Sequence, residues 1–245
     1  MDIPELMKHG NTGSKEHRVA VVSGGTSGIG LTLARGFEAA GYHVHAFGLG
    51  QRPADADGLT FAELDVTDDL EVSGRMKQFE RIDVLVNAAG IIRREEEHDP
   101  VIFARVVNVN LNGAMRMCAS AHSALARCSG SIINIASMLS YFGGGLVPAY
   151  AASKGGIAQL TRSLAISYAP DSIRVNAVAP GWITTPLTAG LQGDEERSAS
   201  IVSRTPLGRW GEPSDLVGPT LFLASEAAGF ITGTLLNVDG GYAAA

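Results

Sequence analysis

The sequence has few cysteines, few charged residues and no long apolar stretch. Its two cysteines, Cys118 and Cys128, are too few for a disulfide framework or a zinc site, and we interpret them as packing residues in a reducing compartment. No run of about 18 apolar residues is present, so no membrane span is expected. Residues 1–17 lack the apolar core of a secretory signal and predict a flexible tail. Together these absences favour a cytoplasmic protein.

Charge of both signs is scarce. Asp, Glu, Lys and Arg make up 18% of the 245 residues, against about 25% in ordinary domains, so we expect a partly apolar surface. Such a surface predicts a homo-oligomer. The 19 basic and 25 acidic residues give a net charge of −6, which argues against a nucleic-acid groove. The expected partner is therefore a small molecule.

Apolar residues, in contrast, form 45% of the chain, enough for a sizeable core in one domain over 18–245. Short apolar runs alternate with amphipathic stretches, which predicts an α/β protein with a seven-stranded parallel sheet and helices on both faces, the Rossmann arrangement. The expected strands are 18–23, 44–48, 59–64, 82–87, 131–136, 173–178 and 235–238. The expected helices are 28–40, 101–127, 149–169 and 214–224, with another after Asp68 and a short piece near 195–203.

A glycine-rich turn separates the first expected strand from the first expected helix. It reads Ser23-Gly24-Gly25-Thr26-Ser27-Gly28-Ile29-Gly30. Glycines let the backbone approach a pyrophosphate closely, and the N-terminus of the following helix offers free N–H groups with partial positive charge. A glycine motif alone is weak evidence, but this one has a strand before it and a helix after it. The context predicts a dinucleotide-binding site.

Tyr150 and Lys154 are four residues apart at the start of an expected long helix, so they share one face. An ammonium near a phenol lowers the phenol pKa from its usual value near 10, which predicts that Tyr150 exchanges a proton near neutral pH. Taken alone, the pair is also compatible with a solvated helix face. Ser137 strengthens the functional interpretation because it follows the fifth expected strand, where open α/β sheets place their chemistry.

These motifs, together with Asn87-Ala88-Ala89-Gly90 after the fourth strand, resemble the short-chain dehydrogenase/reductase family over residues 18 to about 242. The resemblance implies an enzyme that moves a hydride between a nicotinamide cofactor and a carbonyl or secondary alcohol, without a metal. It also implies a homotetramer. The catalytic tetrad that it implies is Asn110, Ser137, Tyr150 and Lys154, with Asn110 chosen over Asn108 and Asn112 by its place in the family pattern.

In the implied roles, Tyr150 gives or takes the hydroxyl proton and Ser137 hydrogen-bonds the substrate oxygen. Lys154 tunes Tyr150 and holds the nicotinamide ribose, and Asn110 props a water in a proton relay. The cofactor positions implied by the family are Gly24, Thr26, Ser27, Gly28, Ile29, Gly30, Asp65, Val66, Asn87, Ala88, Gly90, Tyr150, Lys154, Pro180, Gly181, Ile183 and Thr185. Ala88 departs from the Asn that the family often carries there.

The choice between NAD and NADP rests on the end of the second strand. Gly48 stands where NAD-specific relatives carry an acid, and the nearest cation, Arg52, is either a phosphate ligand or a solvated loop charge. The sequences around residues 90–95, 137–140 and 208–216 resemble family members that act on sugar acids. Those members resemble users of NAD, so the resemblance favours NAD as the cofactor. A 3-oxoacyl-carrier-protein reductase is the alternative. A non-catalytic cofactor sensor would be expected to lack Tyr150 or Lys154.

Four residues are candidates for substrate contact: Arg93, Arg94, Met138 and Trp182. Either arginine suits a substrate carboxylate, although surface pairing with Glu95–Glu97 is the alternative. Residues 184–209 follow the sixth strand and include Gly190, Gly193 and a charged, weakly amphipathic piece. This composition predicts a mobile lid over the substrate, and a permanently ordered loop is the alternative.

Overall fold

The computed structural model describes residues 18–50 and 57–245, so the expected tail 1–17 and Arg52 lie outside the described residues. Seven parallel strands form one sheet in the order β3-β2-β1-β4-β5-β6-β7, which confirms the predicted fold class. The strands are β1 (Val19–Ser23), β2 (His43–Gly48), β3 (Thr60–Glu63), β4 (Val84–Asn87), β5 (Ser131–Ile135), β6 (Arg174–Pro180) and β7 (Leu235–Val238).

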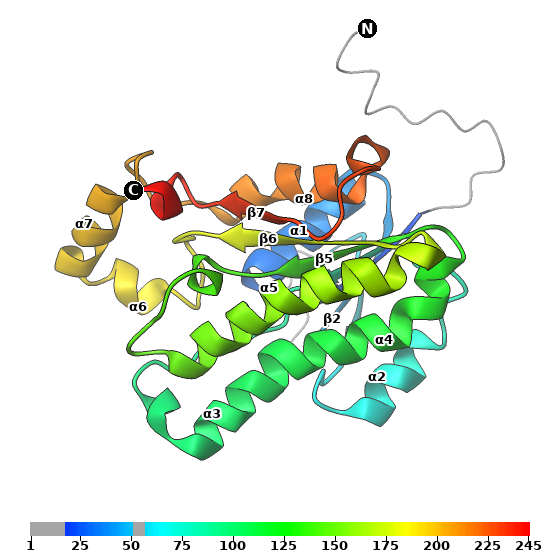
Figure 1. Ribbon diagram of the computed structural model, residues 1–245, viewed down its shortest axis with the longest axis horizontal. Coiled ribbons are helices and arrows are strands. Elements are labelled where there is room, and N and C mark those ends of the chain that lie inside the picture. Colours follow the sequence, from blue (N-terminus) through cyan, green and yellow to red (C-terminus); the bar gives the residue numbers. More distant parts are fainter. Residues whose placement is uncertain (1–17, 51–56) are drawn as a thin grey trace, which may run out of the picture.

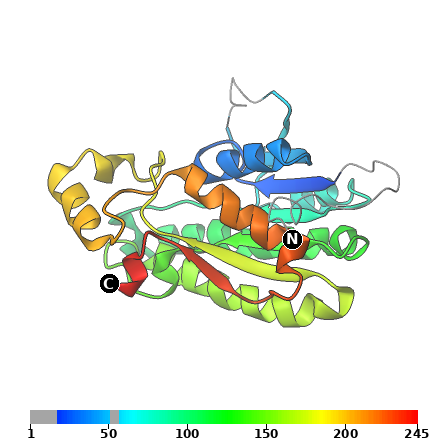
Figure 2. The same cartoon turned by 90° about the horizontal axis from the view of Figure 1, so that it is seen from above.

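Helices cover both faces of this sheet (Figures 1 and 2). On one face lie α1 (Gly28–Ala39) and α8 (Val217–Ala224); on the other lie α2 (Asp69–Met76), α4 (Gly113–Ala126) and α5 (Pro148–Tyr168), with α3 (Pro100–Val107) packed against α5. The side chains of β1 alternate between the two layers. Val21 belongs to the core under α2, α4 and α5, while Ala20 and Val22 belong to the core under α1 and α8.

The expected helix 101–127 is interrupted, which the sequence pattern did not predict. A π-helical turn, Asn108–Asn112, separates α3 from α4. Its extra residue turns Asn110 inward, where the amide hydrogen-bonds to the backbone of Ile91 and to Ser153. The reason is therefore a long-range side-chain contact, which the helical spacing of the sequence does not reveal.

The carboxyl ends of the strands gather at one end of the molecule. The chain that leaves β6 there folds into α6 (Ala189–Gln192) and α7 (Glu195–Arg204), and the C-terminal turn Tyr242–Ala244 lies beside them (Figure 1). The helical piece expected near 195–203 is thus present as α7. Within the described part of the chain, no helix is both long and apolar enough to cross a membrane.

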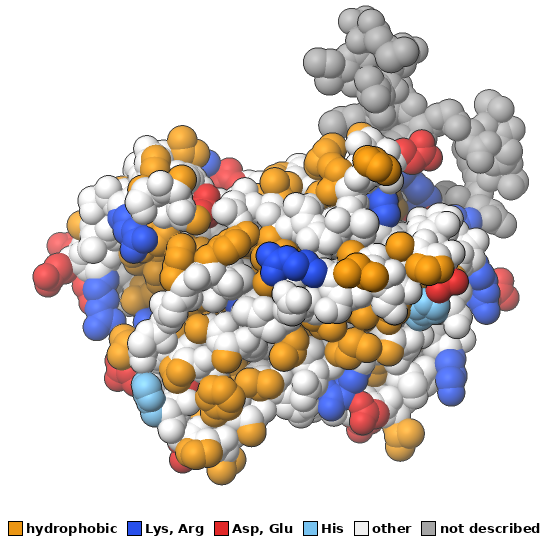
Figure 3. Space-filling view, in the orientation of Figure 1, with side chains coloured by type: hydrophobic (Ala, Val, Ile, Leu, Met, Phe, Trp, Pro, Cys, Tyr) orange, Lys and Arg blue, Asp and Glu red, His pale blue; other side chains and the backbone are white. Residues whose placement is uncertain are grey.

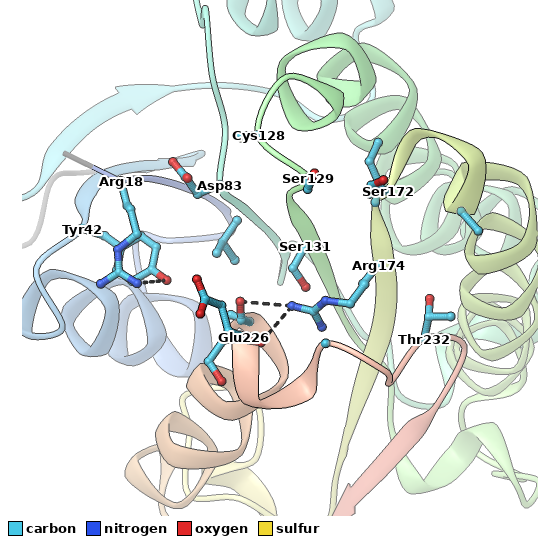
Figure 4. Close-up of a pocket in the computed structure, with 16 residues that line it drawn as sticks. Arg18, Tyr42, Asp83, Cys128, Ser129, Ser131, Ser172, Arg174, Glu226 and Thr232 are labelled. Atoms are coloured by element: carbon cyan, nitrogen blue, oxygen red, sulfur yellow. Dashed lines mark hydrogen bonds between the residues drawn. The ribbon is translucent and has the colours of Figure 1, made fainter. Parts of the chain in front are cut away.

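The opposite end of the sheet holds a cavity of about 520 Å³ (Figure 4). Two arginines line it, and both guanidinium groups are already engaged by the protein. Arg18 donates to the Tyr42 hydroxyl at 3.1 Å, and Arg174 donates to the Leu223 carbonyl at 2.6 Å at the C-terminus of α8. These hydrogen bonds connect the start of β1 to the residue before β2, and the start of β6 to the end of α8.

Candidate active site

The glycine-rich turn connects β1 to α1 through two close backbone approaches. Gly24 has φ +70°, and a Cβ there would lie 2.6 Å from the Ala89 nitrogen. A Cβ on Gly30 would lie 2.1 Å from the Gly24 oxygen. Only glycine fits these two positions, because any side chain would collide with backbone. The glycine-rich turn therefore packs directly against the backbone that follows β4, at Ala88 and Ala89.

The N-terminus of α1 is free to bind an anion. Its N-cap Ser27 makes no side-chain cap hydrogen bond, and the first turn contains no acidic residue. The N–H groups and the helix dipole therefore remain available for a pyrophosphate. Gly28, with φ +51°, faces Thr185, whose Cβ would lie 3.8 Å from an added Cβ. The start of α1 therefore lies beside Thr185, so the structure brings these two sets of predicted cofactor residues together.

Two further predicted cofactor positions, Pro180 and Gly181, lie where β6 meets the final loop. Pro180 pairs with Val238 at the end of the sheet, and a Cβ on Gly181 would lie 2.6 Å from the Asp239 Cα. Ile183 follows and is buried, with a β-bridge to Gly211. These contacts fix the backbone that leads to Thr185 beside the glycine-rich turn.

The expected adenine side has no acid at the end of β2. Gly48 ends this strand, and a Cβ there would lie 2.9 Å from Thr26 Oγ1. Asp65 uses its carboxylate locally, since Oδ1 accepts hydrogen bonds from the Thr67 amide and hydroxyl at 2.8 Å each. Val66 is buried in the core, so only its backbone is free to meet a ligand. The described end of β2 therefore offers no carboxylate to repel a 2′-phosphate.

Asn87 lies in the floor of the predicted site, not on its surface. Its amide donates to Asn134 Oδ1 at 2.9 Å, and Asn134 donates to Thr161 Oγ1 at 2.9 Å. Asn87 Oδ1 is buried without a hydrogen-bond partner. This chain of amides joins β4 to β5 and α5, and Ala88 and Gly90 follow Asn87 in the loop after β4.

Tyr150, Ser137 and Lys154 come together at the carboxyl end of β5. Ser137 caps the short turn after β5, where its Oγ accepts from the Leu139 amide at 3.1 Å, and its side chain also hydrogen-bonds Tyr150. Lys154, one helical turn after Tyr150 on α5, donates to the Ile135 carbonyl at 2.6 Å. Its Nζ lies 5.5 Å from the centroid of the Tyr150 ring.

Asn110 connects this group to the loop after β4. Its Oδ1 accepts from the Ile91 amide at 2.8 Å, and its Nδ2 donates to the Ile91 carbonyl at 2.9 Å. The same Nδ2 donates to Ser153 Oγ at 3.1 Å, which in turn donates to the Tyr150 carbonyl at 2.7 Å. A Cβ on Gly90 would lie 3.5 Å from Asn110 Oδ1 and 4.0 Å from Lys154 Nζ. All four predicted tetrad residues therefore border one site.

Burial dominates the protonation of this group. It raises the pKa of Tyr150 to about 12, with a smaller opposing effect of the Ser137 hydrogen bond and a smaller raising effect of Glu97. It lowers the pKa of Lys154 from 10.5 to about 8. The expectation of a lowered Tyr150 pKa is wrong for this structure, because desolvation of the phenol raises the pKa.

The loop after Gly90 carries two arginines that have no ion-pair partner among the described residues. Arg93 is exposed and Arg94 is half-buried. The alternative that they pair with the following glutamates at the surface was wrong, and Glu97 is instead 1% exposed. Sequence reasoning missed this carboxylate because a run of three glutamates is typical of a solvated face.

Aromatic side chains cluster around Trp182, in the segment that follows β6. Trp182 packs edge-on against Trp210 and Tyr242, with ring centroids 5.9 Å and 6.4 Å apart. Arg204, at the end of α7, lies 4.4 Å from the centroid of Tyr242. Met138, the fourth predicted substrate residue, is 5% exposed in the turn after Ser137. Of the aromatic cluster, only Trp182 was predicted as a substrate residue, because its neighbours come from distant parts of the sequence.

A glycine-rich turn on an open helix N-terminus, beside a Tyr–Lys pair and a serine, defines a nicotinamide-dependent oxidoreductase. Comparison with known proteins agrees. Residues 24–243 match the family described as "Enoyl-(Acyl carrier protein) reductase". The chain belongs to this family, within the short-chain dehydrogenases/reductases, and is an NAD(P)-dependent oxidoreductase that transfers hydride between the cofactor and a carbonyl or secondary alcohol.

Several relatives carry sugar-acid names. The chain is 41% identical to the 2-dehydro-3-deoxy-D-gluconate 5-dehydrogenase of Escherichia coli (strain K12), over 94% of this chain and 97% of that protein. A solved structure described as a putative NAD(P)-dependent gluconate 5-dehydrogenase from Beutenbergia cavernae with bound NADP is 41% identical, with a TM-score of 0.85 over 95% and 99% of the two chains. A gluconate 5-dehydrogenase from Burkholderia cenocepacia in complex with NADP and tartrate is 34% identical, with a TM-score of 0.87 over 93% and 96%.

Proposed function

We propose that the chain oxidises a secondary hydroxyl of a small sugar acid, or reduces the corresponding ketone, with NAD or NADP. The observation that carries this proposal is the pair Arg93 and Arg94, whose guanidinium groups have no ion-pair partner among the described residues. Their loop is tied to the helix of Tyr150. A guanidinium binds a carboxylate through two parallel hydrogen bonds. The names of the relatives support the same substrate class.

The bound nicotinamide supplies or accepts the hydride. Tyr150 gives the proton to the substrate oxygen during reduction and takes it during oxidation. Ser137 hydrogen-bonds that oxygen as charge develops on it. Lys154 would hold the nicotinamide ribose beside Tyr150, and Asn110 fixes the backbone of Ile91 nearby. The N–H groups at the start of α1 would hold the cofactor's pyrophosphate.

The proposed substrate class is tested by a comparison of acids with neutral polyols. We expect kcat/KM with both cofactors to be higher for 2-dehydro-3-deoxy-D-gluconate or D-gluconate than for galactitol. Arg93→Gln or Arg94→Gln should raise KM for the acids about 10–100-fold, the effect of losing a charge-assisted hydrogen bond, and leave the polyol unchanged. Arg105→Gln, an exposed change on α3, is the control. Equal use of acids and polyols, or preference for an acetoacetyl thioester, would contradict the proposal.

We also propose that residues 184–209 form a lid. Among these residues α6 has no buried side chain and α7 buries only Ile201, so opening this segment costs few core contacts. Trp210 Nε1 donates to Ser198 Oγ at 2.9 Å, which gives the segment a contact to close on. Hydrogen exchange over 185–203 should slow when NAD or NADP is added, while exchange in β5 stays unchanged. High protection without cofactor that does not change on binding would contradict the lid.

A homotetramer is the third element of the proposal. Apolar side chains gather on the face formed by α3, α4 and α5 (Figure 3). Val101 and Ile166 are 75% and 78% exposed there, and Phe103 and Met115 also reach the surface. Such a face is typical of a symmetric contact between copies. We further propose a cytoplasmic location, which the free thiols of Cys118 and Cys128 support.

A further inference from the structure

One acidic side chain among the described residues is buried, and it lies at the start of α5, the helix that carries Tyr150. Glu97 is 1% exposed, and among the described residues it and Lys154 are the two charged side chains that are buried. A buried carboxylate is costly unless its oxygens are hydrogen-bonded. No lysine, arginine or histidine of the described chain forms an ion pair with it. The buried carboxylate of Glu97 must therefore be stabilised by hydrogen bonds from other groups.

Both carboxylate oxygens accept hydrogen bonds from backbone. Oε1 accepts from the Arg93 amide at 2.8 Å, and Oε2 accepts from the Tyr150 amide at 2.8 Å. Tyr150 is the third residue of α5, so its amide is one of the four that have no partner within the helix. Val147, the N-cap, makes no side-chain cap hydrogen bond. Glu97 thus caps α5 from a distant segment, with its charge at the positive end of a 21-residue helix.

The surrounding loops are joined in the same place. The Glu95 amide donates to the Leu146 carbonyl at 2.8 Å, and His98 Nε2 lies 3.0 Å from the Gly145 carbonyl. Glu95 itself has φ +72°, a positive value that residues other than glycine rarely adopt. The chain accepts this strain at the point where it turns Glu97 inward. Strained backbone held by surrounding contacts is typical of functional sites.

We propose that Glu97 is a positioning residue for Tyr150, which its carboxylate fixes at the start of α5 while holding the arginine-bearing loop to the same point. The inference rests on the proposed role of Tyr150 as proton donor and acceptor. Glu97 touches the backbone of Tyr150, and no contact with substrate is required of it. Because the Glu97 carboxylate binds the backbone of both Arg93 and Tyr150, a shift of the loop that carries Arg93 and Arg94 would also shift Tyr150.

The charge of Glu97 gives this role a distinctive signature. The groups that face Tyr150 are Ser137 from the turn after β5, Lys154 from α5 and Glu97 from the loop after β4. A negative charge disfavours the phenolate, so its removal lowers the pKa of Tyr150. Alcohol oxidation requires Tyr150 to accept a proton, and its rate therefore rises with pH through that pKa. A residue that merely supports the fold would not move this rise.

The test compares Glu97→Gln and Glu97→Asp with wild type. Glu97→Gln keeps the size, removes the charge and turns an NH2 toward one backbone amide. We expect kcat to fall about 10²-fold through misplacement of the phenol, and the rise of the oxidation rate to move to lower pH than in the wild type. Glu97→Asp keeps the charge but is one methylene too short to reach both amides. It should lower kcat and leave the position of the rise unchanged.

Further variants and a binding measurement distinguish failure of this inference from failure to fold and from failure of the proposed role of Tyr150. Glu96→Gln makes the same charge change on the exposed neighbour and should leave kcat and the pH profile at wild-type values. Cofactor affinity, measured by NADPH fluorescence, should stay within about twofold in every variant, and Glu97→Asp remains informative if Glu97→Gln does not fold. Wild-type kcat and an unmoved pH profile in folded Glu97→Gln would overturn the inference. If Tyr150→Phe also kept wild-type turnover, the proposed role of Tyr150 would fail instead.

Discussion

Replacement of Tyr150 by Phe should lower kcat about 10²–10⁴-fold in both directions and leave the dissociation constant of NAD or NADP nearly unchanged. Phenylalanine keeps the ring in its place and removes only the hydroxyl that hydrogen-bonds Ser137. The substrate oxygen then has no side chain that can supply or accept its proton. Steady-state rates give the loss of turnover, and fluorescence titration of the cofactor gives its affinity.

Tyr168→Phe is the matched control for this change. Tyr168 lies on the same helix and is 9% exposed, and burial raises the pKa of its phenol to about 12, as it does for Tyr150. Its substitution removes a hydroxyl from α5 at the far end from the site, so turnover should be retained. If Tyr150→Phe kept near-wild-type turnover, Tyr150 would not be the proton donor, whatever the control does.

The places of the strands along the chain could be predicted because each is a short apolar run between turn residues. β7 begins and ends where its apolar run predicts, at Leu235 and Val238. The parallel sheet follows from the alternation of strands with helices, because a helix between two strands is the usual crossover connection between parallel neighbours. The glycine-rich turn and the spacing of Tyr150 and Lys154 could also be recognised in the sequence, since both depend on residues close together in the chain.

The remaining features depend on contacts between distant segments. The π-turn at Asn110 exists because the amide reaches Ile91 and Ser153, and no local pattern encodes that. Glu97 looks like one of three surface glutamates until Tyr150, 53 residues later, provides its hydrogen-bond donor. The net rise of the Tyr150 pKa has the same origin, because desolvation comes from the packed surroundings and not from the neighbouring lysine.

Lys154→Met should abolish most turnover and yet leave the protein about as stable as wild type at pH 7. Burial lowers the pKa of the Lys154 ammonium from 10.5 to about 8, so holding the charge inside opposes folding by up to about 3 kcal/mol below pH 8. Methionine removes that cost but leaves the Ile135 carbonyl without the donor that now lies 2.6 Å away, a loss of about 1–3 kcal/mol. The two effects nearly cancel. We expect kcat to fall at least about 10²-fold, because in the proposed mechanism Lys154 holds the nicotinamide ribose beside Tyr150.

The pH dependence of unfolding separates the two effects. Between pH 8 and 10.5 the unfolded lysine holds a proton that the folded lysine has lost, so the unfolded state binds more protons and the stability of the wild type rises with pH. Lys154→Met lacks this rise, and the wild type should therefore gain about 2 kcal/mol over the variant between pH 7 and 10, as measured by urea unfolding. Lys77→Met, at an exposed position after α2, is the control and should follow the wild-type curve. Parallel curves of unfolding free energy against pH for wild type and Lys154→Met would contradict the prediction. They would mean that the folded protein holds the Lys154 ammonium at its ordinary pKa and that desolvation does not lower this pKa.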